Sequence, residues 1–252
     1  MRKTGFAVTA VFVLATIVWA GGDPWKTKPF AQWTDKDIQD ILLNSPWARA
    51  NVQPQGGAWH PDGVTQVSGS MGVAGSSSDK TNTSAGAMPD QQGGAEKNAA
   101  AAAAQATYSI FWWSSRTIRA ASMRRAVLKG TMTQADAEKA VSNTPDEYMI
   151  LVQGTNMSLF QVRGEQAFQN AAFIQLKKTK EKVSPSKVAF IKGPDGTTVT
   201  GAVFYFPKKG SNGEPTISSD EKEIDFNLQV GGSKIFINFD PKKMADNQGE
   251  DL

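Results

Sequence analysis

Apolar and polar residues alternate most regularly in the C-terminal third of the chain. In EIDFNLQV every second residue from Ile224 to Val230 is apolar, and SKIFINFD repeats the pattern from Ile235 to Phe239. A period of two is typical of a β-strand with one buried and one wet face, and the link Gly231-Gly232 suits a tight turn. These residues predict a β-hairpin. A second hairpin is predicted for KVAFIK and TTVTGAVFYF, which flank the turn sequence GPDG.

Between residues 108 and 182 helical and extended patterns are mixed. YSIFWWS, residues 108–114, is dense in aromatic residues and predicts a buried strand. The following RTIRAASMRRAVLKG predicts a helix that ends at Gly130. Further helices are predicted over TQADAEKAV and GEQAFQNAAF, and further strands over EYMILVQG and FIQLKK. Because the helices come early and the hairpins late, we expect an α+β fold, with a mostly antiparallel sheet and helices packed on one face.

A separate short helix is predicted near the N-terminus, in KPFAQWTDKDIQDILLNSPWA, residues 28–48. Thr34 is a favoured N-cap, and Asp37, three residues later, completes a capping box. A helix of about ten residues is unstable alone in water, so its apolar side must dock on its own domain or on a partner. We predict that this docking helix uses Phe30, Trp33, Ile38, Ile41, Leu42 and Trp47.

The composition divides the chain into five parts. Residues 1–20 combine a positive start, an apolar run and small residues before Gly21, as a cleaved signal peptide does. The middle of the chain is rich in Gly, Ser and Ala, which is typical of a disordered linker. The predicted parts are a signal peptide over 1–20, an N-terminal segment with the docking helix over 21–50, a linker over 51–107, a globular domain over 108–244 and a frayed polar tail over 245–252.

Charge and cysteine content narrow the possible functions. The chain has 27 basic and 24 acidic side chains, a net charge of +3 that falls to +1 when Arg2 and Lys3 leave with the signal peptide. So small a charge gives no reason to expect nucleic acid as a partner, and we expect contact with the membrane only through the signal peptide. Because the chain has no cysteine, disulfides, thiol catalysis and cysteine metal sites are excluded.

Few residues are candidates for catalysis. The single histidine, His60, lies in the predicted linker, and the sequence contains no phosphate-binding loop and no nucleophile turn. We therefore predict no metal, no cofactor and no enzyme activity. Carboxylates crowd together between Asp220 and Asp225, but the alternation places Glu223 and Asp225 on the wet face of a strand. A carbohydrate- or peptidoglycan-active protein that uses these acids is the alternative function.

The most charged feature is the predicted helix after residue 115. Side chains three or four positions apart are neighbours on a helix, which brings Arg116 near Arg119 and Arg125 near Lys129. This cluster suits a phosphate, an acidic polysaccharide or an acidic protein surface. The simpler interpretation is a solvated helix face whose arginine stems cover the sheet. The second alternative function is an anion-binding module that uses Arg116, Arg119, Arg124 and Arg125.

Two aromatic motifs flank the Gly/Ser-rich stretch. The first has Lys-Pro, Trp-Thr, a Leu and Ser-Pro-Trp-Ala, and the second has Trp-x-Ser before an Arg-containing helix. Their positions are Lys28, Pro29, Trp33, Thr34, Leu42, Ser45, Pro46, Trp47 and Ala48, then Trp112, Ser114 and Arg119. The chain resembles an uncharacterised family of exported bacterial proteins with these motifs, over most of its length after residue 20. The resemblance implies no known activity and transfers no catalytic residue.

These patterns together predict an exported protein, periplasmic or extracellular, that has no enzyme activity. We expect it to act by binding or assembly at the cell envelope or outside it. Its partner is expected to be an envelope component or another protein.

Overall fold

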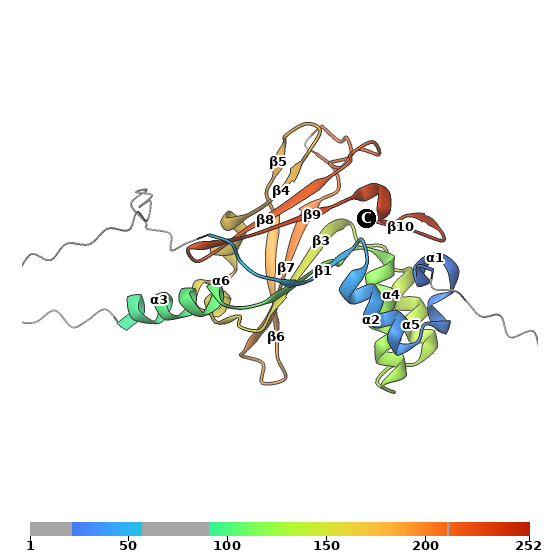
Figure 1. Ribbon diagram of the computed structural model, residues 1–252, viewed down its shortest axis with the longest axis horizontal. Coiled ribbons are helices and arrows are strands. Elements are labelled where there is room, and N and C mark those ends of the chain that lie inside the picture. Colours follow the sequence, from blue (N-terminus) through green and yellow to red (C-terminus); the bar gives the residue numbers. More distant parts are fainter. Residues whose placement is uncertain (1–21, 57–90, 211) are drawn as a thin grey trace, which may run out of the picture.

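The computed structural model describes residues 22–56, 91–210 and 212–252, which form antiparallel sheets of five and four strands, a small two-stranded sheet, and helices at both ends of the larger sheets (Figure 1). The predicted signal peptide and His60 lie outside these residues. The predicted α+β class, with antiparallel strands and helices packed on them, is confirmed. In the part of the chain that the structure describes, no helix is both long and apolar enough to cross a membrane.

The larger sheet has the strand order β1-β2-β3-β7-β6. Its strands are β1 (Ala48–Val52), β2 (Tyr108–Trp112), β3 (Glu147–Gly154), β7 (Val199–Pro207) and β6 (Lys187–Lys192). Trp112 lies opposite Ile150 in the β2–β3 ladder, and both side chains are fully buried. The predicted strands at the start of the globular domain and the β6–β7 hairpin are confirmed.

The smaller sheet has the strand order β5-β4-β8-β9. Its strands are β5 (Lys182–Val183), β4 (Ala172–Leu176), β8 (Ile224–Val230) and β9 (Ser233–Phe239). The predicted β8–β9 hairpin is confirmed, with Ile224 opposite Phe239. Its apolar residues join the core of the larger sheet, since the rings of Phe226 and Phe204 pack edge to face with centroids 5.6 Å apart. The two sheets therefore share one hydrophobic core.

The prediction that Asp225 lies on a wet strand face is wrong. Only 7% of this residue is exposed. β8 lies between β4 and β9, and the side chains of these two strands flank Asp225. Asp225 lies opposite Gln175 of β4 and Asn238 of β9, and the Asn238 side-chain amide donates to Asp225 Oδ1 (3.2 Å). Period-two alternation identifies the two faces of a strand, but it does not show that neighbouring strands cover the polar one.

The helices form two groups at opposite ends of the sheets (Figure 1). One group contains α1 (Pro24–Thr27), the 3₁₀ turn η1 (Phe30–Gln32), α2 (Asp35–Asn44), α4 (Arg116–Leu128) and α5 (Gln134–Ser142). The other group contains α3 (Gln91–Ala104) and α6 (Ser158–Ala171). The helix that was predicted to begin at Gly164 begins six residues earlier, at Ser158. Gly164 has a φ of +76° and lies at a kink between two helical stretches of α6.

The predicted linker over 51–107 is folded at both of its ends. β1 extends to Val52, and Gln55 exchanges two backbone hydrogen bonds of 2.8 Å with Lys234 of β9. At the other end α3 packs on α6 and β8. This packing needs small side chains, because a Cβ at Gly231 would lie only 2.9 Å from the Cβ of Ala100. Residues 57–90 lie outside the described part of the chain.

The prediction of a frayed C-terminal tail is also wrong. Residues 241–250 form the 3₁₀ turn η2 (Pro241–Lys243) and a short hairpin of β10 (Ala245–Asp246) and β11 (Gly249–Glu250). Met244 and Asp251 are buried. The composition of this tail is polar, but its polar groups have partners elsewhere in the fold.

Candidate binding site where the two ends of the chain meet

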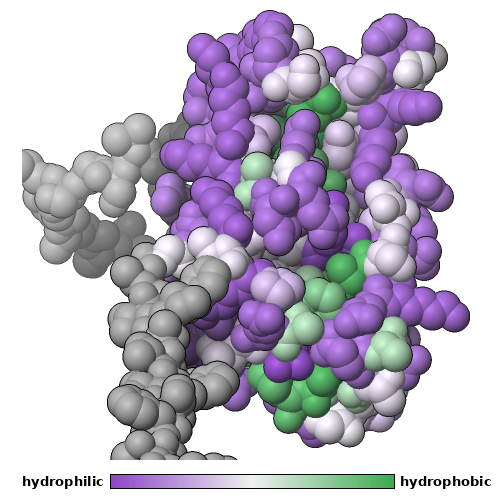
Figure 2. All heavy atoms as spheres, turned by 90° about the vertical axis from the view of Figure 1, so that its right-hand side faces the viewer, coloured by the Kyte–Doolittle hydropathy of each residue, from purple (hydrophilic) through white to green (hydrophobic). Residues whose placement is uncertain are grey.

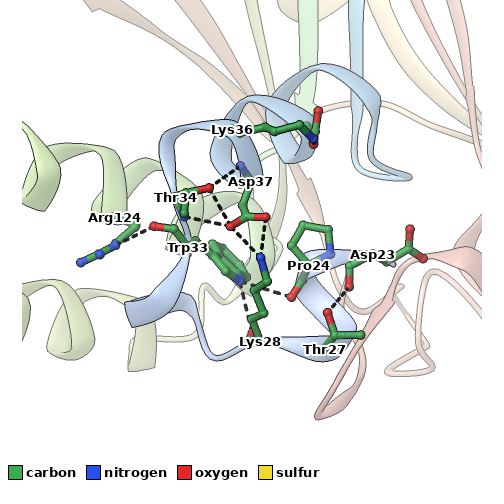
Figure 3. Close-up of polar contacts among 10 residues, drawn as sticks. Asp23, Pro24, Thr27, Lys28, Trp33, Thr34, Lys36, Asp37 and Arg124 are labelled. Atoms are coloured by element: carbon green, nitrogen blue, oxygen red, sulfur yellow. Dashed lines mark hydrogen bonds and ion pairs between the residues drawn. The ribbon is translucent and has the colours of Figure 1, made fainter. Parts of the chain in front are cut away.

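The N-terminal helix α2 docks on its own chain, against α4 and β1. The structure buries Trp33, Ile38, Ile41, Leu42 and Trp47, and it packs the partly buried Phe30 against the same core. The Trp33 indole Nε1–H donates to the carbonyl oxygens of Pro24 (3.3 Å) and Lys28 (3.2 Å), as Figure 3 shows. All six residues that were predicted to dock are therefore buried or partly buried in the core, and Trp33 also fixes the path of the chain that precedes α2.

The start of α2 is held by a capping box in which Asp37 is the central group (Figure 3). Its carboxylate accepts from the backbone N–H of Thr34 (2.9 Å) and from Lys28 Nζ (3.0 Å). Burial alone would raise the pKa of Asp37, but the hydrogen bonds from Thr34 and Lys28 outweigh it and lower the pKa below 3.8. The charged form is therefore favoured in the folded protein.

The start of α4 is held by the other end of the chain. The Asp251 carboxylate accepts from the backbone N–H groups of Arg116 (2.6 Å) and Thr117 (2.9 Å). A carboxylate is stabilising here, because the first N–H groups of a helix lack partners within the helix and carry a partial positive charge. The Trp47 indole N–H donates to the backbone carbonyl of Asp251 (2.6 Å). Trp47 and Asp251 thus connect the two ends of the chain directly.

The predicted anion-binding arginines are largely engaged in contacts within the protein. Arg116 Nε and Nη2 donate to the two Asp246 carboxylate oxygens (2.8 and 2.6 Å), and this hydrogen bonding raises the pKa of Arg116. Arg119 Nη1 donates to three carbonyl oxygens at the C-terminal end of α5, at 2.5–3.2 Å. Arg124 Nε donates to the carbonyl of Trp33 (3.1 Å), whereas Arg125 is exposed. The first three arginines tie α4 to its neighbours.

The acids just before β8 are held in a similar way. Glu221 is buried, and its Oε1 accepts from the backbone N–H groups of Lys178 (3.1 Å) and Lys222 (3.0 Å). Glu223 pairs with Lys177 (3.0 Å). Among the described residues no group of histidines or acids is arranged to hold a metal ion. These contacts give the acids structural roles.

A cavity of about 320 Å³ lies where the N-terminal segment, the α4–α5 pair and the C-terminal hairpin meet. We call it the junction cavity. Aromatic side chains from the N-terminal segment line it together with residues from α4, α5 and β10, and the lining includes Trp25, Phe30, Trp33, Thr117, Val141 and Asp246. Figure 2 looks onto this end of the molecule, where polar side chains cover most of the surface and apolar residues emerge in small patches.

Two polar atoms at the junction cavity are buried and have no hydrogen-bond partner among the described residues. They are the indole Nε1 of Trp25 and the hydroxyl oxygen of Thr117, and both residues line the cavity. An unpartnered buried donor costs free energy, and other such atoms lie elsewhere in the described residues, for example on Thr216 and Glu221. The aromatic and aliphatic lining with a few polar groups, rather than these two inaccessible atoms, makes the junction cavity the candidate binding site.

Sequence reasoning identified only part of this site. The aromatic residues Phe30 and Trp33 were predicted to dock, and Arg116 belonged to the anion-binding cluster of the second alternative function. Trp25, Thr117 and Asp251 were not singled out, because their roles depend on contacts between distant parts of the chain. The sequence Asp23-Pro24-Trp25, with proline at a helix start, was the one local signal near Trp25.

The family models, curated proteins and solved structures with which the chain was compared gave no match. The resemblance to an uncharacterised exported family therefore stays a prediction.

Proposed function

We propose that this chain is an exported, non-enzymatic binding protein and that the junction cavity is its ligand-binding site. The observation that carries the proposal is a cavity of about 320 Å³ that is lined by aromatic and aliphatic side chains together with a few polar and charged groups. Ligand sites combine an apolar lining with a few polar groups that fix orientation, and the junction cavity has this composition. The site of action would be the cell envelope or the space outside it, as the first twenty residues predict.

The binding proposal is tested by blocking the cavity from its rim. Ser142 is exposed at the end of α5 and lines the cavity, so Ser142→Trp places a bulky ring at the opening without changing the core. A panel of small neutral fragments is screened against the protein by ligand-observed NMR. We expect fragments that bind the original protein and Ser142→Ala but not Ser142→Trp. Absence of binding, or binding that Ser142→Trp leaves intact, contradicts the proposal.

Export is tested separately, by mass spectrometry of the protein released from cells. The expected mature chain begins at Gly21. Released protein that still carries residue 1 contradicts export through a cleaved signal peptide.

A further inference from the structure

The smaller sheet has a face that points away from the shared core, and we call it the outer face. Phe226 of β8 points into the core, where it packs on Phe204 of the larger sheet. Because side chains alternate along a strand, its neighbour Asn227 lies on the outer face. Phe173 of β4 and Phe236 of β9 both lie opposite Asn227, so they share this face, about 10 Å apart across two strand spacings. Phe236 is 48% exposed.

The outer face contains an open hollow of about 430 Å³ beside the C-terminal end of α6. An aromatic ring, three amides and a lysine are among its lining groups: Asn170, Phe173, Asn227, Gln229 and Lys234. The side-chain nitrogens of Asn227 and Gln229 donate to the backbone carbonyls of Asp225 (3.2 Å) and Gly231 (3.0 Å). Each amide keeps a second N–H and an oxygen. The hollow therefore offers both donors and acceptors next to an aromatic ring.

The lysines of the outer face are free to attract an anion. Lys182 and Lys234 are exposed, and neither forms an ion pair within the part of the chain that the structure describes. Lys182 Nζ lies 4.7 Å from the centre of the Phe173 ring, and Lys234 Nζ lies 5.5 Å from the centre of the Phe236 ring. Each aromatic ring of the outer face therefore has a mobile positive charge beside it.

The acids of the outer face are already engaged. Asp225 is buried, and its Oδ1 accepts from the Asn238 amide (3.2 Å). Glu223, which continues the same alternation just before β8, pairs with Lys177 (3.0 Å). The described residues that line the hollow include no acid. A ligand with a negative charge would therefore meet lysines rather than an opposing carboxylate.

We propose that the outer face binds an acidic oligosaccharide. Its sugar rings would place their C–H faces on Phe173 and Phe236, and its hydroxyl groups would exchange hydrogen bonds with the amides of the hollow. Its carboxylates would pair with Lys182 and Lys234. Each lysine must move off its ring to allow stacking, which its flexible stem permits. This site shares no lining residue with the junction cavity, so the inference goes beyond the proposed function.

The pattern of groups decides against two other anions. A simple ion such as phosphate would use the lysines but neither aromatic ring. Single-stranded nucleic acid carries a charge on every nucleotide and depends on many cations, whereas this face has two unpaired lysines among the described residues. A chain of sugar rings alternates apolar faces with hydroxyl groups, as the outer face alternates Phe173, Asn227 and Phe236.

The test measures saccharide binding by isothermal titration calorimetry at low ionic strength. The probe is tetragalacturonic acid, and neutral cellotetraose is the comparison. We expect the acidic probe to bind more tightly and to lose affinity as salt is added. Phe236→Ala should weaken binding about fivefold, because the half-exposed ring loses its apolar contact, whereas Phe236→Tyr keeps the ring and should retain binding. Lys234→Gln should weaken binding about threefold at low salt and have no effect at high salt.

Two substitutions outside the outer face are matched controls. Leu128→Ala removes an apolar side chain of similar exposure from α4, since Leu128 is 42% exposed. Lys192→Gln removes an exposed lysine from β6. Both variants should bind tetragalacturonic acid as the original protein does. The melting temperature of Phe236→Ala is measured in parallel and should stay unchanged, so that a loss of binding is not a loss of folding.

Four outcomes overturn the inference. Absence of saccharide binding, or equal affinity for the acidic and neutral probes, shows that the ligand class is wrong. A single-stranded oligodeoxynucleotide that binds more tightly than tetragalacturonic acid at the same salt identifies nucleic acid as the occupant. Self-association that Phe236→Ala abolishes in sedimentation velocity identifies a second copy of the chain. Saccharide binding that Ser142→Trp removes and Phe236→Ala does not belongs to the junction cavity.

Discussion

The two ends of this chain reach the same cavity, but different interactions hold them there. In the N-terminal segment the main polar contacts are local, since Thr34, Asp37 and Lys28 lie within ten residues of one another. In the C-terminal tail they are distant, since Asp251 contacts the start of α4 and Trp47, more than a hundred residues away in sequence. Local contacts leave a sequence pattern, whereas distant ones depend on the finished fold. The contacts of the N-terminal segment could therefore be predicted from the sequence, whereas those of the C-terminal tail could not.

The largest loss of stability is expected from a substitution at the point where the two ends of the chain touch. Trp47 is fully buried, packs on Trp25 and donates to Asp251. Trp47→Ala should lower the free energy of unfolding by about 3–5 kcal/mol, the usual cost of truncating a buried aromatic residue. Urea unfolding followed by circular dichroism measures it.

The control for this change is Leu43→Ala on the same N-terminal segment. Leu43 is 51% exposed, so the free energy of unfolding of this variant should stay within about 0.5 kcal/mol of the original protein. If Trp47→Ala costs no more than this control, the two ends are not joined as described.

A smaller loss of stability is expected when only the C-terminal cap of α4, the Asp251 carboxylate, is removed. Asp251→Ala leaves two N–H groups at the start of α4 without their acceptor. The free energy of unfolding should fall by about 1–2 kcal/mol, the usual cost of losing a helix cap. Glu250→Ala changes the exposed neighbouring residue and should have little effect in the same urea experiment. Equal stabilities for the two variants would mean that the tail does not hold α4.

The smallest effect is expected at the N-terminal cap, and it depends on pH. Because the pKa of Asp37 is lowered in the folded state, its charged form stabilises the fold above the unfolded pKa, near 3.8, and this contribution is lost as the pH falls through the folded pKa. Asp37→Asn should therefore be less stable than the original protein at pH 7, by about 1 kcal/mol. Urea unfolding of both proteins at several pH values should show the difference shrinking below about pH 3.8. A difference that does not change with pH would show that the charge of Asp37 is unimportant.

The comparison also explains which parts of the fold could be predicted. The β6–β7 and β8–β9 hairpins and helices α4 and α5 follow from local periodicity and turn residues. Strand β1 was missed because ARANV has no alternation of its own. It becomes a strand through pairing with β2, where Arg49 lies opposite Ile110. The part of the site that was missed, Thr117 with Asp251, is likewise formed by segments that meet only after folding.

The position of β1 has a consequence for the order in which the chain can fold. The segment 22–56 supplies the edge strand that covers β2 and the helix that covers α4, but both of those partners lie beyond residue 107. Until the chain has been extended past α4, this segment lacks its partners, and Trp25, Trp33 and Trp47 cannot be buried. An unpaired edge strand is a template for aggregation, so β2 is exposed to the same risk until β1 arrives. The earliest of the described segments therefore supplies the edge strand β1, which completes the larger sheet.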